Sequence, residues 1–321
     1  MKPTLRPRFA FVLVLLSLAV LTACIPTPAT PAAPETHTPV EWTIISIRTA
    51  TDTPQPPTPT TAPSATPAPT DTATTAPVEP SPDATRSCQE GKGEVVYDRF
   101  DSQILGYKFY FTLYLPPCYD PDAAETYPVL YLLHGLGSDD SQWVQIGVPG
   151  MMDELIASGE VQPFIIVMPR EPNAYAPSQS KFDLVLIDEL RPYIDEHYAT
   201  RGNGQYRAIG GLSRGAGWAL RIGMNFPQFF SAIGMHSVAV FEGDDIAAVR
   251  KLSTLPVDER PALFIDIGSN DSEIYSARDF EHTLFAARIA HTWYELAGTH
   301  NEAYWQAHAP IYLRWYSSEI N

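Results

Sequence analysis

Cysteine is scarce in this sequence, and basic side chains are outnumbered. Three cysteines among 321 residues are too few for a fold held together by several disulfides. The eight histidines are scattered and show no spacing typical of a zinc site, so we predict no metal. With 21 basic against 37 acidic residues, the formal net charge of −16 argues against nucleic acid and anionic membrane surfaces as partners.

An apolar run, Phe9–Val20, follows three basic residues near the N-terminus. It is too short for an ordinary transmembrane span and is typical of a secretory signal. The next residues, Leu21-Thr22-Ala23-Cys24, resemble the bacterial lipobox, in which the cysteine is diacylated and becomes the mature N-terminus. We therefore expect residues 1–23 to be a lipoprotein signal peptide. The chain would then be exported and lipid-anchored through Cys24 to the outer face of the cell membrane. The alternative is a plain signal peptide with a chance cysteine.

Residues 24–87 have almost no aromatic side chains and are dominated by two residue types. Of these 64 residues, 15 are proline and 17 are threonine. Such a segment cannot bury enough apolar surface to offset the entropy lost on ordering. We predict a disordered Pro/Thr-rich linker that holds a domain away from the membrane.

The remaining residues, 88–321, are enough for a single α/β domain. Three basic residues precede Cys24, and the linker holds six acidic and two basic residues, which leaves a formal charge of −15 for this domain. The simplest role of that charge is solubility.

The two cysteines of this domain form a candidate pair in an oxidising compartment. Cys118 follows a predicted hairpin made of Glu94–Ser102 and Tyr107–Leu115, in a register that places it opposite about Gly93. The glycines at 91 and 93 would let Cys88 fold back to meet Cys118. We predict a disulfide between Cys88 and Cys118, with two free thiols as the alternative.

Strands and helices alternate after the hairpin, which predicts a mostly parallel, doubly wound α/β sheet. Several strands are continuous apolar runs, as expected when both faces of a sheet are covered. The predicted strands are Pro128–Leu133, Phe164–Met168, Gln205–Gly210, Ala232–Met235, Ala262–Ile267 and Thr292–Leu296. The predicted helices are Met151–Ser158, Phe182–Tyr198 with an interruption at Pro192, Gly215–Asn225, Ser276–Ala286 and Ala303–Tyr316.

The motif Gly211-Leu212-Ser213-Arg214-Gly215 lies between a predicted strand and a predicted helix. In that context a GxSxG motif predicts a nucleophile elbow, a tight turn that exposes the serine hydroxyl. The start of the helix adds backbone N–H groups and a dipole that favour negative charge nearby. Ser213 is therefore the candidate nucleophile.

A serine nucleophile needs a base and an orienting carboxylate, which follow it in this chain order in such folds. His300 lies in the loop just after the strand Thr292–Leu296, whereas His282 and His308 fall in predicted helices. Asp271 lies in the loop after Ala262–Ile267. We predict the triad Ser213, Asp271 and His300, with a helix N-cap as the alternative role of Asp271.

The loop His134-Gly135-Leu136-Gly137 follows an earlier buried strand. The backbone N–H groups of Leu136 and Arg214 are the predicted oxyanion-hole donors. We interpret His134 as a residue that supports this loop rather than as a proton carrier. Trp143 and Tyr175 fall on predicted loops at the same edge, but we do not assign either to the site.

Five blocks of the domain resemble, in order, the esterase family that includes esterase D (S-formylglutathione hydrolase), feruloyl and acetyl-xylan esterases, tributyrin esterases and the antigen 85 mycolyltransferases. The blocks are Tyr114–Asp120, Tyr127–Gly135, Gly210–Gly215, Gly268–Asp271, and Gly298–His300 with Tyr304-Trp305. The resemblance implies an α/β-hydrolase fold, the same triad and the same two N–H donors. At Cys118 relatives are expected to have glycine, a departure that fits a disulfide in an exported branch.

Together these features predict a serine carboxylic-ester hydrolase that forms an acyl-enzyme on Ser213 and needs no cofactor. The expected substrates are extracellular esters of small-acyl, acetyl or feruloyl type, either small molecules or polysaccharide. An acyltransferase of the antigen 85 kind would use the same triad with a sugar alcohol in place of water. A non-catalytic surface binder is a third reading, against which the complete triad argues.

Overall fold

The computed structural model describes residues 91–122 and 126–321. The predicted signal peptide and linker, Cys24 and Cys88 lie outside these residues, so the lipid anchor and the disulfide stay predictions. Cys118 has a φ of 57°, in the left-handed region that favours glycine, which gives a physical reason for the glycine expected there in relatives. Within the described residues, no helix is both long and apolar enough to cross a membrane.

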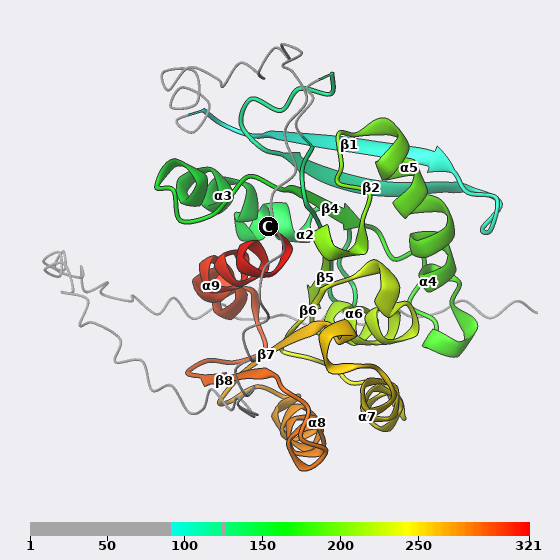
Figure 1. The fold of residues 1–321 in the computed structure, drawn as a ribbon, viewed down its shortest axis with the longest axis vertical. Helices are drawn as coiled ribbons and strands as arrows, with labels where there is room; N and C mark the ends of the chain where they lie inside the picture. The colour runs from blue at the N-terminus through cyan, green and yellow to red at the C-terminus, as the bar shows by residue number, and fades with distance from the viewer. Residues whose placement is uncertain (1–90, 123–125) are drawn as a thin grey trace, which may run out of the picture. The chain divides into compact units, whose positions relative to one another are not determined.

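The described residues form an eight-stranded sheet with the order β1-β2-β4-β3-β5-β6-β7-β8 (Figure 1). Its strands are β1 (Glu94–Asp101), β2 (Lys108–Leu115), β3 (Val129–Leu133), β4 (Ile165–Pro169), β5 (Arg207–Leu212), β6 (Ala232–His236), β7 (Ala262–Gly268) and β8 (Thr292–Leu296). β2 pairs antiparallel with β1 and with β4, and the remaining pairs are parallel. The predicted mostly parallel sheet with an N-terminal antiparallel hairpin is confirmed.

Most strand bounds differ from the prediction by one or two residues, and two of the differences have consequences. The hairpin pairs Glu94 with Leu115, a register two residues away from the one that would place Cys118 opposite Gly93. β5 ends at Leu212 rather than Gly210, because its pairing with β6 continues as far as Leu212 opposite His236. The extra two residues bring the strand directly up to Ser213.

The helices are α2 (Gln142–Ile146), α3 (Val148–Ala157), α4 (Phe182–Leu184), α5 (Arg191–His197), α6 (Arg214–Asn225), α7 (Asp244–Thr254), α8 (Ile274–Ala286) and α9 (Glu302–Ile320). Residues 185–190 join α4 to α5 through π-helical turns. Pro192 lies in the first turn of α5 and has no N–H to donate to the preceding turn. The missing hydrogen bond accounts for the π-helical turns just before α5. The sequence did not predict α2, which has only five residues, or α7, which buries only a narrow apolar stripe.

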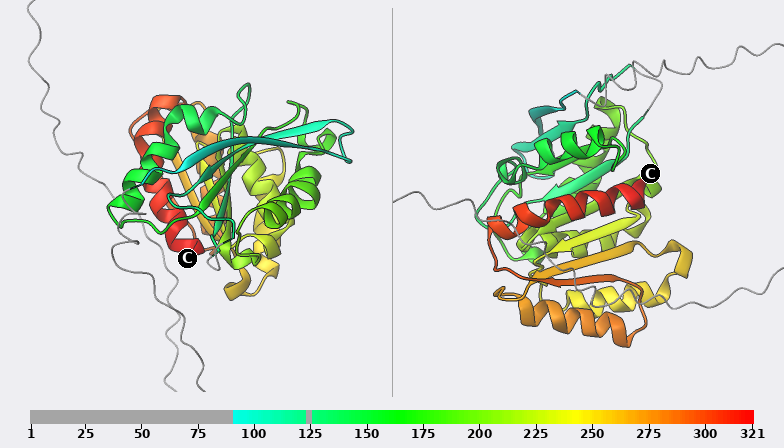
Figure 2. Two further views of the ribbon diagram at one scale, coloured as in Figure 1. Left: turned by 90° about the horizontal axis from the view of Figure 1, so that it is seen from above. Right: turned by 90° about the vertical axis from the view of Figure 1, so that its left-hand side faces the viewer.

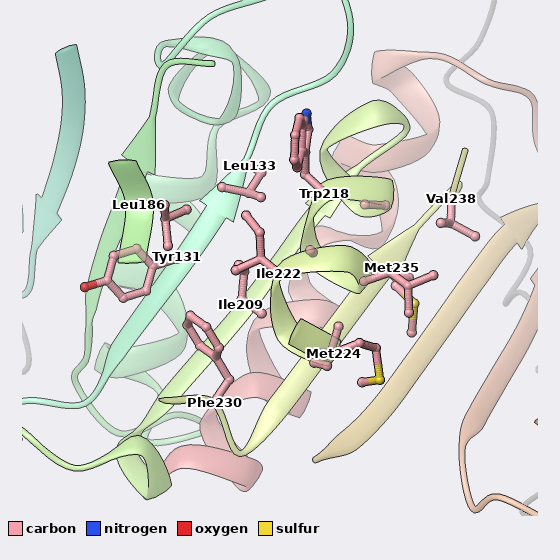
Figure 3. Close-up of a cluster of buried hydrophobic side chains, with 14 of the residues drawn as sticks. Tyr131, Leu133, Leu186, Ile209, Trp218, Ile222, Met224, Phe230, Met235 and Val238 are labelled. Atoms are coloured by element: carbon pink, nitrogen blue, oxygen red, sulfur yellow. The ribbon is translucent and has the colours of Figure 1, made fainter. Parts of the chain in front are cut away.

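Helices cover both faces of the sheet (Figure 2). α2, α3 and α9 pack on one face, and α4 to α8 pack on the other. Figure 3 shows part of the second layer, where Ile222 of α6 lies beside Ile209 of β5. Because β3, β4, β5 and β6 are buried along their whole length, their C-terminal ends are fixed in space and can position a site.

α9 approaches the sheet closely through one tyrosine. The hydroxyl of Tyr316 lies so near Gly234 of β6 that a Cβ on that glycine would overlap it. The same hydroxyl is 3.0 Å from Nε2 of His236, two residues further along β6. Gly234 therefore leaves the space that lets α9 bind β6.

We expect Gly234→Ala to lower the free energy of unfolding by about 1–3 kcal/mol, because the added methyl group must displace Tyr316. Gly150→Ala is the matched control: a Cβ at this position in α3 meets nothing within 4 Å. It should be neutral or stabilising by up to about 1 kcal/mol. Denaturant unfolding of both variants gives the comparison, and equal stabilities would contradict the proposed close approach.

Candidate active site

Ser213 occupies a strained turn between β5 and α6. Its φ of 54° and ψ of −120° lie outside the regions that residues other than glycine usually adopt. The Ser213 N–H donates to the carbonyl of His236 on β6 at 2.8 Å, and the Ser213 carbonyl accepts from the N–H groups of Gly217 and Ala239. A Cβ on Gly211 would come within 2.7 Å of the Leu133 carbonyl oxygen, so the turn also needs that glycine. This is the geometry of a nucleophile elbow.

Three side chains from separate segments meet at this turn. The Ser213 hydroxyl lies 2.8 Å from Nε2 of His300, and Nδ1 of His300 lies 2.8 Å from Oδ1 of Asp271. A carboxylate only accepts, so Nδ1 carries the proton shared with Asp271. In the neutral ring, Nε2 is then the acceptor that faces the serine hydroxyl. The His300 side chain is 23% exposed, whereas that of Asp271 is fully buried. The structure thus brings together the three predicted residues in the order that nucleophilic catalysis requires.

The pKa of the Asp271 carboxyl lies below its usual value. Burial has the largest single effect and raises the pKa, but hydrogen bonds from His300 and from the backbone N–H of Glu273 contribute to an overall lowering. Asp271 therefore stays ionised, which is the state that holds the His300 Nδ1–H in place. Oδ1 of Asp271 also accepts from the N–H of Glu273, two residues further on. Glu273, not Asp271, is the N-cap of α8, so the alternative role of Asp271 as a helix N-cap is wrong.

The loop after β3 lies on the other side of Ser213. The N–H of Gly135 donates to Oε1 of Gln142 at 2.9 Å. The N–H of the next residue, Leu136, has no hydrogen-bond partner among residues 91–122 and 126–321. Arg214 is the first residue of α6, where a backbone N–H has no acceptor within the helix. The two predicted donors are therefore unoccupied backbone N–H groups flanking the serine.

His134 supports this loop. Its Nε2 accepts from the N–H of Glu171 at 2.9 Å, so its proton lies on Nδ1, 2.8 Å from the Gly135 carbonyl oxygen. Burial lowers the pKa of His134, which favours the neutral ring that this arrangement needs. Trp143 belongs to α2 rather than to a loop. It is buried beneath the strand end, where its Nε1–H donates to the carbonyl of Leu133.

The Arg214 side chain fastens a second loop to the elbow. Its guanidinium makes a two-point contact with Glu171, at 2.8 Å from Nε and 2.6 Å from Nη2. Nη2 also donates to the carbonyl of Tyr175, a residue that is 61% exposed. The sequence predicted only the Arg214 backbone role, because an ion pair 43 residues apart leaves no pattern in the chain.

A second His–Asp pair lies beneath the site and is completely buried. Nδ1 of His236 is 2.7 Å from Oδ1 of Asp266, and Oδ2 of Asp266 accepts from the hydroxyls of Tyr304 and Tyr312. Burial and the neighbouring carboxylate raise the pKa of both tyrosines, so their hydroxyls stay protonated and donate. Since Tyr316 occupies Nε2 of His236, this pair has no atom open to a substrate.

A cavity of about 540 Å³ opens over the serine. Its lining residues are Gly135, Leu136, Gln142, Leu212, Ser213, His300, Asn301, Glu302, Ala303 and Trp305. It is therefore bounded by the loop after β3, the elbow and the start of α9. Among the described residues, no group of three or more His, Cys, Asp or Glu side chains is arranged to hold a metal ion.

The family model described as "Putative esterase" matches residues 102–315. The chain belongs to this family. Membership of this family confirms two predictions: the α/β-hydrolase fold and the enzyme class, serine esterase.

Relatives of this esterase chain include known enzymes. An endo-1,4-beta-xylanase/feruloyl esterase of Xylanibacter ruminicola is 32% identical over 197 residues, 56% of this chain and 25% of the relative. An esterase of Mycobacterium tuberculosis is 31% identical over 149 residues, 44% of this chain and 31% of the relative. The match thus spans less than a third of the length of each of these two relatives.

Solved structures give the same fold. A ferulic acid esterase is 26% identical with a TM-score of 0.65, and the match covers 72% of this chain and all of that one. An S-formylglutathione hydrolase from Staphylococcus aureus has a TM-score of 0.56 at 18% identity, covering 70% of this chain and 99% of that one. The second likeness supports the fold alone.

We expect Asp271→Asn to show the pH range over which the carboxylate stabilises the fold. The folded-state pKa lies below the usual 3.8, so its stabilisation is fully present above the unfolded-state pKa and disappears as the pH falls through the folded-state pKa. The difference in unfolding free energy between wild type and variant should therefore shrink as the pH falls from about 5 to about 3. Denaturant unfolding across this range tests it, and a difference that stays constant or grows would contradict the lowered pKa.

Proposed function

We propose that this chain is a serine carboxylic-ester hydrolase whose catalytic residues are Ser213, His300 and Asp271. The observation that carries the proposal is the position of His300, which bridges the Ser213 hydroxyl and the buried Asp271 carboxylate at 2.8 Å on each side. A serine held this way in a strained elbow is the arrangement that generates an alkoxide-like nucleophile near neutral pH.

In the proposed reaction, Ser213 attacks the ester carbonyl while His300 takes its proton. The tetrahedral oxyanion is bound by the N–H groups of Leu136 and Arg214. His300, now protonated and held by Asp271, donates the proton to the leaving alcohol, and the acyl group stays on Ser213. Water activated by His300 then attacks the acyl-enzyme, releasing the acid and restoring the serine.

The proposed substrates are small acyl, acetyl or feruloyl esters, as small molecules or on polysaccharide. The names of the relatives support feruloyl esters, since both a curated relative and a structural neighbour are feruloyl or ferulic acid esterases. His300 lines the cavity over Ser213 and its side chain is 23% exposed, which suits water as the acceptor. Acyl transfer to a sugar alcohol is the second candidate, because the same triad serves both reactions.

We expect the full-length chain to hydrolyse p-nitrophenyl esters from acetate to decanoate or a feruloyl ester, and Ser213→Ala to lower kcat by at least about 10⁴-fold. Ser318→Ala, a substitution at an exposed serine of α9, is the matched control and should retain full activity. Release of p-nitrophenolate or ferulate gives the rates. A folded wild type without turnover on any ester would sink the hydrolase proposal, and product formed only when a sugar alcohol is added would favour the transferase.

We also propose that the chain is exported and anchored to the outer face of the cell membrane through a lipid on Cys24. The lipobox-like residues 21–24 and the Pro/Thr-rich linker support this placement. In cells, Cys24→Ser should move the protein from the membrane fraction to the soluble fraction and abolish incorporation of labelled palmitate. Recovery of unlabelled wild-type protein in the soluble fraction would refute the anchor.

A further inference from the structure

Gln142 is a buried side chain of the cavity that the sequence did not single out. It begins α2, is 6% exposed, and lines the same cavity as Ser213 and His300. The position that a Cβ on Gly135 would take lies 3.6 Å from Cβ of Ser213 and 3.7 Å from Oε1 of Gln142. The carboxamide and the serine therefore both lie close to Gly135, in the cavity where an ester carbonyl must bind.

The orientation of this carboxamide follows from its one hydrogen bond to the protein. Gly135 presents an N–H, so the Gln142 atom 2.9 Å away must be the oxygen, because only the oxygen accepts. The other end of the group is then the –NH₂, which carries two donors. Within the described residues this nitrogen has no hydrogen-bond partner, and it belongs to a residue whose accessible surface is in the cavity.

This nitrogen keeps some accessible surface, unlike the fully buried unpaired polar atoms of the described residues, so a group in the cavity can accept a hydrogen bond from it. Water can do so in the empty site, and an ester oxygen can do so when substrate is bound. The position of Gln142 favours the ester oxygen that becomes negative in the transition state. Gln142 and Ser213 both lie close to Gly135, and Leu136, whose N–H also has no partner among the described residues, lines the same cavity.

We propose that Gln142 is a catalytic residue that completes the oxyanion hole. Its oxygen accepts from the Gly135 N–H and so holds the loop that carries the Leu136 N–H, and its –NH₂ donates a third hydrogen bond to the carbonyl oxygen of the ester. The inference rests on the proposed ester hydrolysis and adds a side-chain donor to the two backbone donors. A side-chain donor can be removed by substitution, whereas the two backbone N–H donors cannot, so the role of Gln142 can be tested directly.

The test is Gln142→Glu in the full-length chain, because a carboxylate still accepts from the Gly135 N–H but has no –NH₂. We expect kcat for p-nitrophenyl acetate to fall about 100-fold with little change in KM, since the bond is made mainly in the transition state. Gln145→Glu is the matched control: it adds the same charge three residues along α2 on an exposed position, and should keep wild-type rates. Thermal unfolding of both variants checks that the loop stays folded.

A thionoester separates the hydrogen bond from the added charge. Sulfur in place of the carbonyl oxygen is a weak acceptor, so losing a donor penalises the ester more than the thionoester, whereas an added charge or a displaced serine penalises both. We expect Gln142→Glu to lower the ester-to-thionoester ratio of kcat/KM about tenfold. An unchanged ratio would overturn the proposal and leave Gln142 as a support for the loop.

Labelling by a fluorophosphonate keeps the inference testable if the proposed function fails. The probe phosphonylates a reactive Ser213 without ester turnover, and its phosphoryl oxygen needs the same donors. Its labelling rate, followed by mass spectrometry, should fall about tenfold in Gln142→Glu and stay unchanged in Gln145→Glu. Equal rates in wild type and Gln142→Glu would refute the role of Gln142, whereas absent ester hydrolysis with a normal difference in labelling would refute only the substrate class.

Discussion

The backbone of Ser213 is held in a conformation that costs on the order of 1–3 kcal/mol, and the other groups of the site are placed around it. Hydrogen bonds from neighbouring elements keep the turn in this conformation. The Ser213 N–H binds the last residue of β6, and its carbonyl binds Gly217 of α6 and Ala239 beyond β6. The strain is thus fixed by the sheet and by the helix packed on it. This is why burial of β5 and β6 along their full length matters for chemistry: a looser sheet would let the serine relax out of reach of His300.

The two His–Asp pairs show how environment decides the role of the same residue types. Asp266 lies within β7 and Asp271 in the loop that follows, so one pair is enclosed by α9 and the other lies at the edge of a cavity. In the enclosed pair, Tyr316 occupies the outer nitrogen of His236. In the pair at the cavity, Nε2 of His300 contacts the Ser213 hydroxyl. Only the second can receive a proton from a nucleophile, although the first is the more fully hydrogen-bonded.

Much of this arrangement could be predicted from the sequence. Buried parallel strands are continuous apolar runs, and the residues at their ends, Ser213, Asp271 and His300, follow a known chain order. The resemblance to the esterase family rests on the same segments. Contacts between distant segments could not be predicted. The ion pair of Arg214 with Glu171 and the buried Asp266 network depend on packing, and Gln142 matters only through its position beside Gly135. α2 and α7 were missed because a five-residue helix has no period and α7 buries little apolar surface.

The start of α9 explains why Gly298-Thr299-His300 is followed by Tyr304-Trp305 in the motif. Tyr304 donates to Asp266, and Nε1–H of Trp305 donates to the hydroxyl of Ser237, just beyond β6. The Trp305 ring also packs edge-on against the His300 imidazole, with ring centroids 5.1 Å apart. A buried polar network is satisfied in only one arrangement, so the first turn of α9 can bind the sheet in one register. His300, two residues before that helix, is thereby placed in part by Tyr304, Asp266 and Ser237, none of which lines the cavity.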